Sequence, residues 1–278
     1  MPSLPSIPSY HVGHVLSRSG GTAIVYWGVD LKTGYPVAIK QLYASRRHCL
    51  DLRDEARKYL YLHHPNLTRL VDFVIEGEQC YLIMEFVEGK PLDEYQKTKS
   101  GPLPDEVAIP IFMQLLDTIK YLHDNNVLHL DIKPNNIMIK DDRSIKVLDM
   151  GISTKLHASE EHSKVRGTPS FMPPEQIDGA RLGRYTDIFA LGVTLYYMLT
   201  MHLPFPGTTT QEIWDNIKKG NHTPMEAYYP FVNKKLAPVI AKALHPDPRQ
   251  RYRDCREMIR DLRRVSPDKF RNNINIKN

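Results

Sequence analysis

Residues 129–136 read HLDIKPNN and place three functional groups in one short segment between apolar runs. Asp131 supplies a carboxylate that can orient a hydroxyl group or accept its proton. Lys133 can neutralise a transferring phosphoryl group, and Asn136 offers a hard oxygen to a cation. A turn with a purely structural role needs none of this combination, so the segment predicts a functional loop.

Three features precede this loop. Residues 16–25, LSRSGGTAIV, place Gly20 and Gly21 between two strand-like runs, where backbone N–H groups can approach phosphate oxygens. Lys40 closes the apolar run VAIK, and Glu55 lies on the core-facing side of the next helical segment. Each has a simpler interpretation when taken alone: a hairpin turn, a surface lysine and a solvated glutamate.

Two further features follow the loop. Residues 147–151, VLDMG, place Asp149 after a buried strand, which in isolation is only a turn. Residues 167–175, GTPSFMPPE, begin with Gly167 and Thr168 and end at Glu175, and Asp187 and Arg251 come later in the chain. The order of all six features is more informative than any one of them.

In this order the motifs resemble those of eukaryotic-type (Hanks-type) serine/threonine protein kinases, from about residue 10 to about residue 262. Lys133 and the Gly167-Thr168 pair resemble the corresponding residues of the serine/threonine class, and several short sequence segments resemble those of soluble bacterial members. The resemblance implies ATP-dependent phosphorylation of Ser and Thr hydroxyls on protein substrates. The cofactors it implies are ATP and Mg²⁺, with Mn²⁺ as an alternative metal.

The resemblance also assigns roles to individual residues. It makes Asp131, Lys133, Lys40 and Glu55 catalytic, with Glu55 as the helix partner of Lys40, and Asn136 and Asp149 metal ligands. The implied ATP-binding residues are Leu16, Gly20, Gly21, Val25, Ala38, Lys40, Met84, Glu85, Val87 and Met138. The implied structural or regulatory residues are Glu175 paired with Arg251, Asp187 holding the catalytic loop, Met150, Thr168, and His129 as a buried packing and hydrogen-bonding residue.

The sequence departs from the family pattern in three places. Arg18 and Ala23 replace the outer glycines of the glycine loop, and Met150 replaces a phenylalanine to give DMG. Leu130 replaces the arginine that precedes the catalytic aspartate, which makes the chain a non-RD variant with HLD. Because that arginine normally binds a phosphorylated activation loop, we expect activity that depends little on loop phosphorylation. Alternatively Leu130 only packs, and Lys155, Lys164 or Arg166 binds the phosphate.

The pattern of apolar residues predicts an α+β fold of two lobes. Short β-branched and aromatic runs give a β-rich N-lobe at about residues 10–88, and helical stripes give a larger C-lobe at about residues 89–264. The boundary is expected near Gly89. Residues 1–9, rich in Pro and Ser, are expected to form an extended leader outside the core, and residues 265–278 a polar, basic tail.

Composition limits the remaining possibilities. The 278 residues carry a net charge of +5, which fits an anionic ligand but no nucleic-acid partner. The three cysteines, Cys49, Cys80 and Cys255, are widely separated, so free thiols and no disulfide are expected. With no apolar run of membrane-spanning length, a cytoplasmic location is expected. A monomer or weak dimer is also expected. A pseudokinase that binds without phosphoryl transfer is the alternative, and a kinase of small molecules or lipids is a third.

Overall fold

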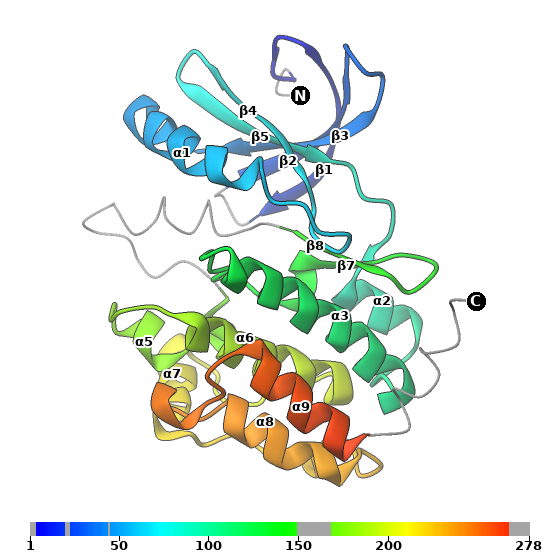
Figure 1. Ribbon diagram of the computed structural model, residues 1–278, viewed down its shortest axis with the longest axis vertical. Coiled ribbons are helices and arrows are strands. Elements are labelled where there is room, and N and C mark those ends of the chain that lie inside the picture. The colour runs from blue at the N-terminus through cyan, green and yellow to red at the C-terminus, as the bar shows by residue number, and fades with distance from the viewer. Residues whose placement is uncertain (1–3, 20–22, 44, 149–167, 267–278) are drawn as a thin grey trace. The chain divides into compact units, whose positions relative to one another are not determined.

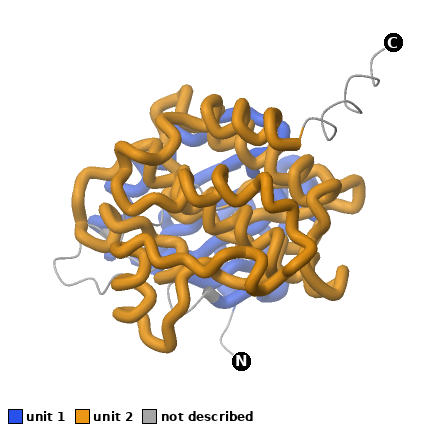
Figure 2. The backbone as a smooth tube through the Cα atoms, turned by 90° about the horizontal axis from the view of Figure 1, so that it is seen from below, with its two compact units in different colours: residues 1–88, 152–161 blue, residues 89–151, 162–278 orange. Residues whose placement is uncertain are grey.

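The computed structural model describes residues 4–19, 23–43, 45–148 and 168–266. The chain divides into two compact units, and the described residues up to Glu88 belong to the first and those from Gly89 to the second (Figure 2). Gly89 has a φ of +153°, and a side chain there would meet the Ile139 carbonyl oxygen at 2.6 Å. A residue other than glycine would therefore be strained at the start of the second unit.

The first unit is built on a five-stranded antiparallel sheet (Figure 1). Its strands lie in the order β1-β2-β3-β5-β4. Their bounds are β1 (Tyr10–Ser19), β2 (Ala23–Asp30), β3 (Pro36–Leu42), β4 (Leu70–Glu76) and β5 (Gln79–Glu85). The β-branched and aromatic runs of the sequence thus form strands, as predicted.

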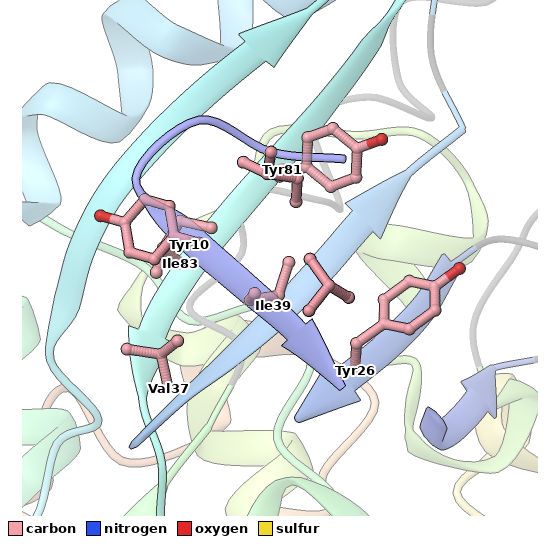
Figure 3. Packing of buried hydrophobic residues seen from close by; sticks show 8 residues of the cluster. Tyr10, Tyr26, Val37, Ile39, Tyr81 and Ile83 are labelled. Carbon is pink, nitrogen blue, oxygen red and sulfur yellow. The ribbon is translucent and has the colours of Figure 1, made fainter. Parts of the chain in front are cut away.

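Alternation along the strands gives the sheet two different faces. One face carries a cluster of buried side chains that includes Tyr26, Val37, Ile39, Tyr81 and Ile83 (Figure 3). Ile7, which is only 4% exposed, belongs to the same cluster and bridges to Tyr10. The expectation that residues 1–9 lie outside the core is therefore wrong at Ile7, because this apolar side chain completes the face.

Helix α1 (Arg46–Tyr59) packs on the other side of the sheet, against β4 and β5. The side chain of Ser45 caps its first turn by accepting a hydrogen bond from the His48 amide. Cys49, Leu52, Ala56 and Tyr59 recur at helical spacing and are all buried.

A disulfide joins Cys49 of α1 to Cys80 of β5, so the expectation that all three cysteines are free thiols is wrong. The two residues are 31 positions apart in the sequence, but the packing of α1 on the sheet brings their Cα atoms to 5.8 Å. That separation lies within the range that a disulfide bridges. Cys255, in the second unit, is free and buried.

The second unit is mainly helical, with a small sheet in the order β6-β7-β8. Its strands are β6 (Lys90–Pro91), β7 (Ile137–Ile139) and β8 (Ile145–Val147). Its α-helices are α2 (Leu92–Thr98), α3 (Asp105–Asp124), α5 (Pro174–Ile177), α6 (Arg184–Thr200), α7 (Thr210–Lys219), α8 (Ala237–Ala243) and α9 (Cys255–Val265). Its short 3₁₀ helices are η1 (Pro134–Asn136), η2 (Pro169–Phe171), η3 (Met225–Ala227), η4 (Lys234–Leu236) and η5 (Pro248–Gln250).

Helices α3 and α6 pack against each other and form the centre of the second unit. The nearly continuous apolar run 188–199 lies in α6, whose residues are almost all buried. A sheet-based unit and a helical unit together confirm the predicted α+β class. In the part of the chain that the structure describes, no helix is both long and apolar enough to span a membrane.

Candidate active site

The loop that follows α3 brings the three predicted groups into direct contact. Lys133 Nζ lies 2.9 and 3.0 Å from the two carboxylate oxygens of Asp131. Asn136 Nδ2 donates to Asp131 twice, to the backbone carbonyl and to Oδ2, both at 2.8 Å. The carboxylate is therefore oriented from two sides, while Asp131 keeps 31% of its side chain exposed. The Asp131 carboxylate is thus held in one orientation and remains accessible to a ligand.

His129 is fully buried and connects the start of the loop to the residue after β8. Its Nδ1 accepts the Asp131 amide at 3.3 Å, and its Nε2 lies 3.0 Å from the Leu148 carbonyl oxygen. A neutral ring protonated on Nε2 satisfies both contacts, because a carbonyl oxygen can only accept. Both ring nitrogens thus take part in hydrogen bonds, one within the loop and one to the residue after β8.

Asp187, in the first turn of α6, holds the backbone of the same loop. It accepts the amides of His129 at 2.9 Å and Leu130 at 2.8 Å, and His123 Nε2 donates to it at 2.8 Å. Burial alone would raise the pKa of Asp187, but these donors outweigh burial and hold its pKa below the ordinary value. Leu130 has a φ of +63°, which is unfavourable for leucine. The hydrogen bond from its backbone N–H to Asp187 helps to hold this conformation.

A second buried carboxylate lies next to this network. Glu175 and Arg251 form a bidentate ion pair, in which Arg251 Nη1 and Nη2 lie 2.8 and 3.0 Å from the two carboxylate oxygens. Thr186 donates to Glu175 at 3.1 Å, and the adjacent Asp187 holds the loop of residues 129–136. The first turn of α6 therefore contacts both this loop and the segment that ends at Glu175.

Four of the predicted ATP-binding residues of the first unit share one face of its sheet. Lys40 lies opposite Val25 of β2, and Ala38 lies opposite Met84 of β5. Residues opposite each other, or two apart on one strand, point to the same side of a sheet. These four side chains therefore point away from the cluster of Figure 3. Lys40 is only 6% exposed and the other three are half-buried.

The remaining predicted residues fall into three groups. Leu16 is exposed on β1, Glu85 ends β5 and accepts the Arg69 amide at 3.1 Å, and Val87 follows β5. In the second unit Met138 is half-buried in β7, and Thr168 is exposed before η2. Outside the described residues lie Gly20, Gly21, Asp149, Met150 and the side chain of Glu55.

The donor atoms of the loop fit a hard divalent cation. Because the amide nitrogen of Asn136 faces Asp131, its Oδ1 is the atom left to act as a metal ligand. Among the described residues no hydrogen bond is accepted by this oxygen, and Asn136 is fixed by its own backbone bonds to Lys133 and Leu148. Asn136 therefore stays a predicted metal ligand, and its Oδ1 is the atom that would bind the cation.

The protein kinase domain family matches residues 10–262 of the chain, which include both units. The chain belongs to the protein kinase family. Its kinase fold resembles the crystal structure of Rad53 1–466 in complex with AMP-PNP, with a TM-score of 0.77 and 26% sequence identity. That similarity covers 91% of this chain and 65% of the Rad53 chain.

The kinase also resembles curated bacterial proteins. It is 34% identical over 250 residues to the serine/threonine-protein kinase PrkC of Bacillus subtilis, covering 88% of this chain and 38% of PrkC. It is 31% identical over 267 residues to PknB of Mycobacterium leprae, covering 92% of this chain and 43% of PknB. The chain thus spans about two-fifths of the length of these relatives.

Two features of the kinase were missed by sequence reasoning. His123 continues the apolar stripe of α3, four residues after Ile119, so its spacing indicated burial but not its contact with Asp187. The disulfide of Cys49 and Cys80 had no sequence signal beyond the presence of two cysteines. Only the packing of α1 on β5 brings that pair together.

Proposed function

We propose that this kinase transfers the γ-phosphoryl group of ATP to Ser and Thr hydroxyls of protein substrates. The observation that carries the proposal is the contact of Asp131 with both Lys133 and Asn136. It orients a carboxylate, an ammonium group and a carboxamide within one loop, in which Asp131 keeps 31% of its side chain exposed. The bacterial relatives named above are serine/threonine-protein kinases, which supports the same reaction.

In this reaction the substrate hydroxyl oxygen bonds to the γ-phosphorus, and the bond to the β,γ-bridging oxygen breaks. Asp131 orients the hydroxyl and accepts its proton. Lys133, already within 3.0 Å of that carboxylate, neutralises charge on the transferring group. Asn136, together with Asp149, would hold Mg²⁺, which supplies further charge neutralisation at the phosphates when bound.

In the first unit, Lys40 is proposed to bind the ATP phosphates, with Glu55 orienting its ammonium group. Lys40 lies on the face of the sheet where α1 packs, and Glu55 belongs to α1. Val25, Ala38 and Met84 lie on the same face and offer half-buried apolar surface to the adenine and ribose. Lys40→Ala should therefore weaken the productive positioning of the phosphates.

We further propose that activity depends little on phosphorylation of the activation loop. The residue before Asp131 is Leu130, which has no charge with which to bind a phosphate. The amides of His129 and Leu130 are instead held by Asp187 of α6. The catalytic loop therefore has a fixed support that needs no phosphate.

The test is the rate of phosphate transfer from radiolabelled ATP and Mg²⁺ to a generic basic protein. Asp131→Asn should lower kcat by about 10²–10⁴-fold and leave nucleotide affinity nearly unchanged. Asp142→Asn is the matched control, because among the described residues this exposed carboxylate accepts hydrogen bonds from Ser144 in the β7–β8 turn and lies outside the loop of residues 129–136. Nucleotide binding without transfer by the wild-type chain would refute the proposal and indicate a pseudokinase.

A further inference from the structure

The Cys49–Cys80 disulfide lies on the same face of the first-unit sheet as Lys40. Cys80 is directly opposite Leu42, and Leu82 is directly opposite Lys40. Lys40 and Leu42 are two apart on β3, as Cys80 and Leu82 are on β5, so all four side chains point to one side. All four are buried, with exposed fractions of 6% or less. On this face, the Cys80–Leu42 pair is the neighbour of the Leu82–Lys40 pair, so the disulfide to α1 lies next to Lys40.

On the helix, the disulfide holds the N-terminal turn. Cys49 is the fourth residue of α1, and the remaining buried side chains, Leu52, Ala56 and Tyr59, lie towards its C-terminal end. Leu50, next to Cys49, is 42% exposed. Among the described residues of α1, Cys49 is thus the first buried apolar anchor. Without the bond, the first turn loses its covalent attachment, while the rest of the helix keeps its apolar contacts.

The site also accommodates the reduced state. A free cysteine behaves as a small apolar residue, and both positions are fully buried. Reduction therefore does not place an unsatisfied charge in the core. Because both sulfurs are buried, a reductant reaches them only when the N-terminal turn of α1 opens locally. Reduction of the disulfide should therefore be slow.

We propose that Cys49 and Cys80 are a redox modification site that clamps the first turn of α1 to the sheet beside Lys40. A dithiol reductant attacks one sulfur of the disulfide as a thiolate, breaks the S–S bond and forms a mixed disulfide, and the released cysteine takes up a proton. The second thiol of the reductant then displaces the other cysteine. Two electrons and two protons pass to the protein, and the reductant leaves as its own cyclic disulfide.

The consequence for catalysis rests on the proposed function. The oxidised clamp keeps α1, and with it Glu55, at a fixed place over the face that carries Lys40. Reduction frees the first turn and broadens the positions that α1 occupies, so fewer molecules hold Lys40 in its productive orientation. The oxidised kinase should therefore be the more active form, with the difference in kcat/KM for ATP.

The first measurement counts thiols. The chain has three cysteines, so alkylation of the oxidised protein after denaturation should add one group, at Cys255, and alkylation after reduction should add three. Three alkylated cysteines in protein treated with oxidised glutathione under native conditions would overturn the proposal. This readout needs no activity.

The second measurement compares the oxidised and reduced wild-type chains by hydrogen exchange and by kinetics. Reduction should speed amide exchange of residues 46–52 by about tenfold or more, without changing exchange in α6. It should lower kcat/KM for ATP by about tenfold. Equal exchange at residues 46–52 in the two states would overturn the clamp. Faster exchange with equal kcat/KM would overturn its catalytic role.

Two variants complete the design. Cys49→Ala with Cys80→Ala should behave like the reduced wild type and show no response to reductant or oxidant. Cys255→Ser, in the second unit, should keep the full response. If the double variant fails to fold, the reduced wild type still supplies the comparison. If neither redox state transfers phosphate, the proposed function fails, while the thiol count and the exchange data still decide the clamp.

Discussion

The two units of this kinase hold their predicted functional residues by different means. In the first, α1 is attached beside Lys40 by the Cys49–Cys80 disulfide and by a stripe of apolar side chains. In the second, the loop of residues 129–136, which we propose is the catalytic loop, is attached to α6 by a buried carboxylate, Asp187, which accepts two backbone amides and a histidine N–H. One attachment is covalent and apolar, and the other is electrostatic.

This difference predicts which conditions disturb which unit. Apolar contacts and a disulfide carry no titratable charge, so the first attachment is sensitive to reductant and not to acid. A buried carboxylate whose donors lower its pKa responds to protonation and is indifferent to thiols. The two attachments can therefore be broken separately, and each experiment serves as a control for the other.

The largest effect is expected from Asp187→Asn. The substitution places an amide N–H₂ where three donors converge, so at least one donor loses its acceptor in a fully buried site. The free energy of unfolding should fall by about 3–5 kcal/mol, measured by urea denaturation. The kcat should fall as well, because the backbone of His129 and Leu130 is released.

The matched control is Asp124→Asn, at the end of α3. Its carboxylate accepts from Arg256 at 2.8 Å but is about one-third exposed. An ion pair of this kind contributes about 0–1 kcal/mol. Equal losses in the two variants would show that burial does not distinguish the attachment by Asp187.

The next largest effect is expected in the first unit when the disulfide is removed. Cys49→Ala with Cys80→Ala should lower the free energy of unfolding of that unit by about 2–4 kcal/mol, because the closed segment spans 31 residues. Urea unfolding followed by hydrogen exchange assigns the loss to a unit. A loss shared equally by α1 and α6 would contradict the separation of the two attachments.

A smaller effect is expected from acid, and only in the second unit. Because the pKa of Asp187 is lower in the folded protein, its stabilising contribution is complete above about pH 4 and is lost as the pH falls through the folded value. The difference in unfolding free energy between wild type and Asp187→Asn should therefore shrink below about pH 4. Stability curves between pH 3 and 7 test this, and a constant difference would refute it.

Much of the fold followed from the sequence because the patterns are local. The alternation of more and less buried side chains in the strands between Tyr26 and Ile39 can be recognised without knowledge of distant contacts, and so can the apolar run of α6. The catalytic loop was equally readable, since Asp131, Lys133 and Asn136 lie within six residues of one another. Residues that are close in sequence and chemically unusual are the ones that reasoning from sequence finds.

The rest depended on contacts between distant segments. Ile7 joins the core because the first unit needs one more apolar side chain on its sheet, which the Pro- and Ser-rich composition around it concealed. His123 and Asp187 are 64 residues apart, and Cys49 and Cys80 are 31 apart. No spacing rule connects these pairs, because only helix packing brings them together.

The smallest effect is expected from dephosphorylation, which tests whether Asp187 alone is sufficient to hold the catalytic loop. Phosphatase treatment of the wild-type kinase should change kcat by less than about tenfold, or ~1.4 kcal/mol, because Leu130 offers no charge to a phosphate. Leu130→Arg restores such a charge, so phosphatase treatment should affect this variant more than the wild type. A drop greater than tenfold in the wild type would mean that another cation, such as Lys155, Lys164 or Arg166, binds a loop phosphate. The electrostatic attachment of the second unit would then have two parts, one fixed in α6 and one supplied by modification.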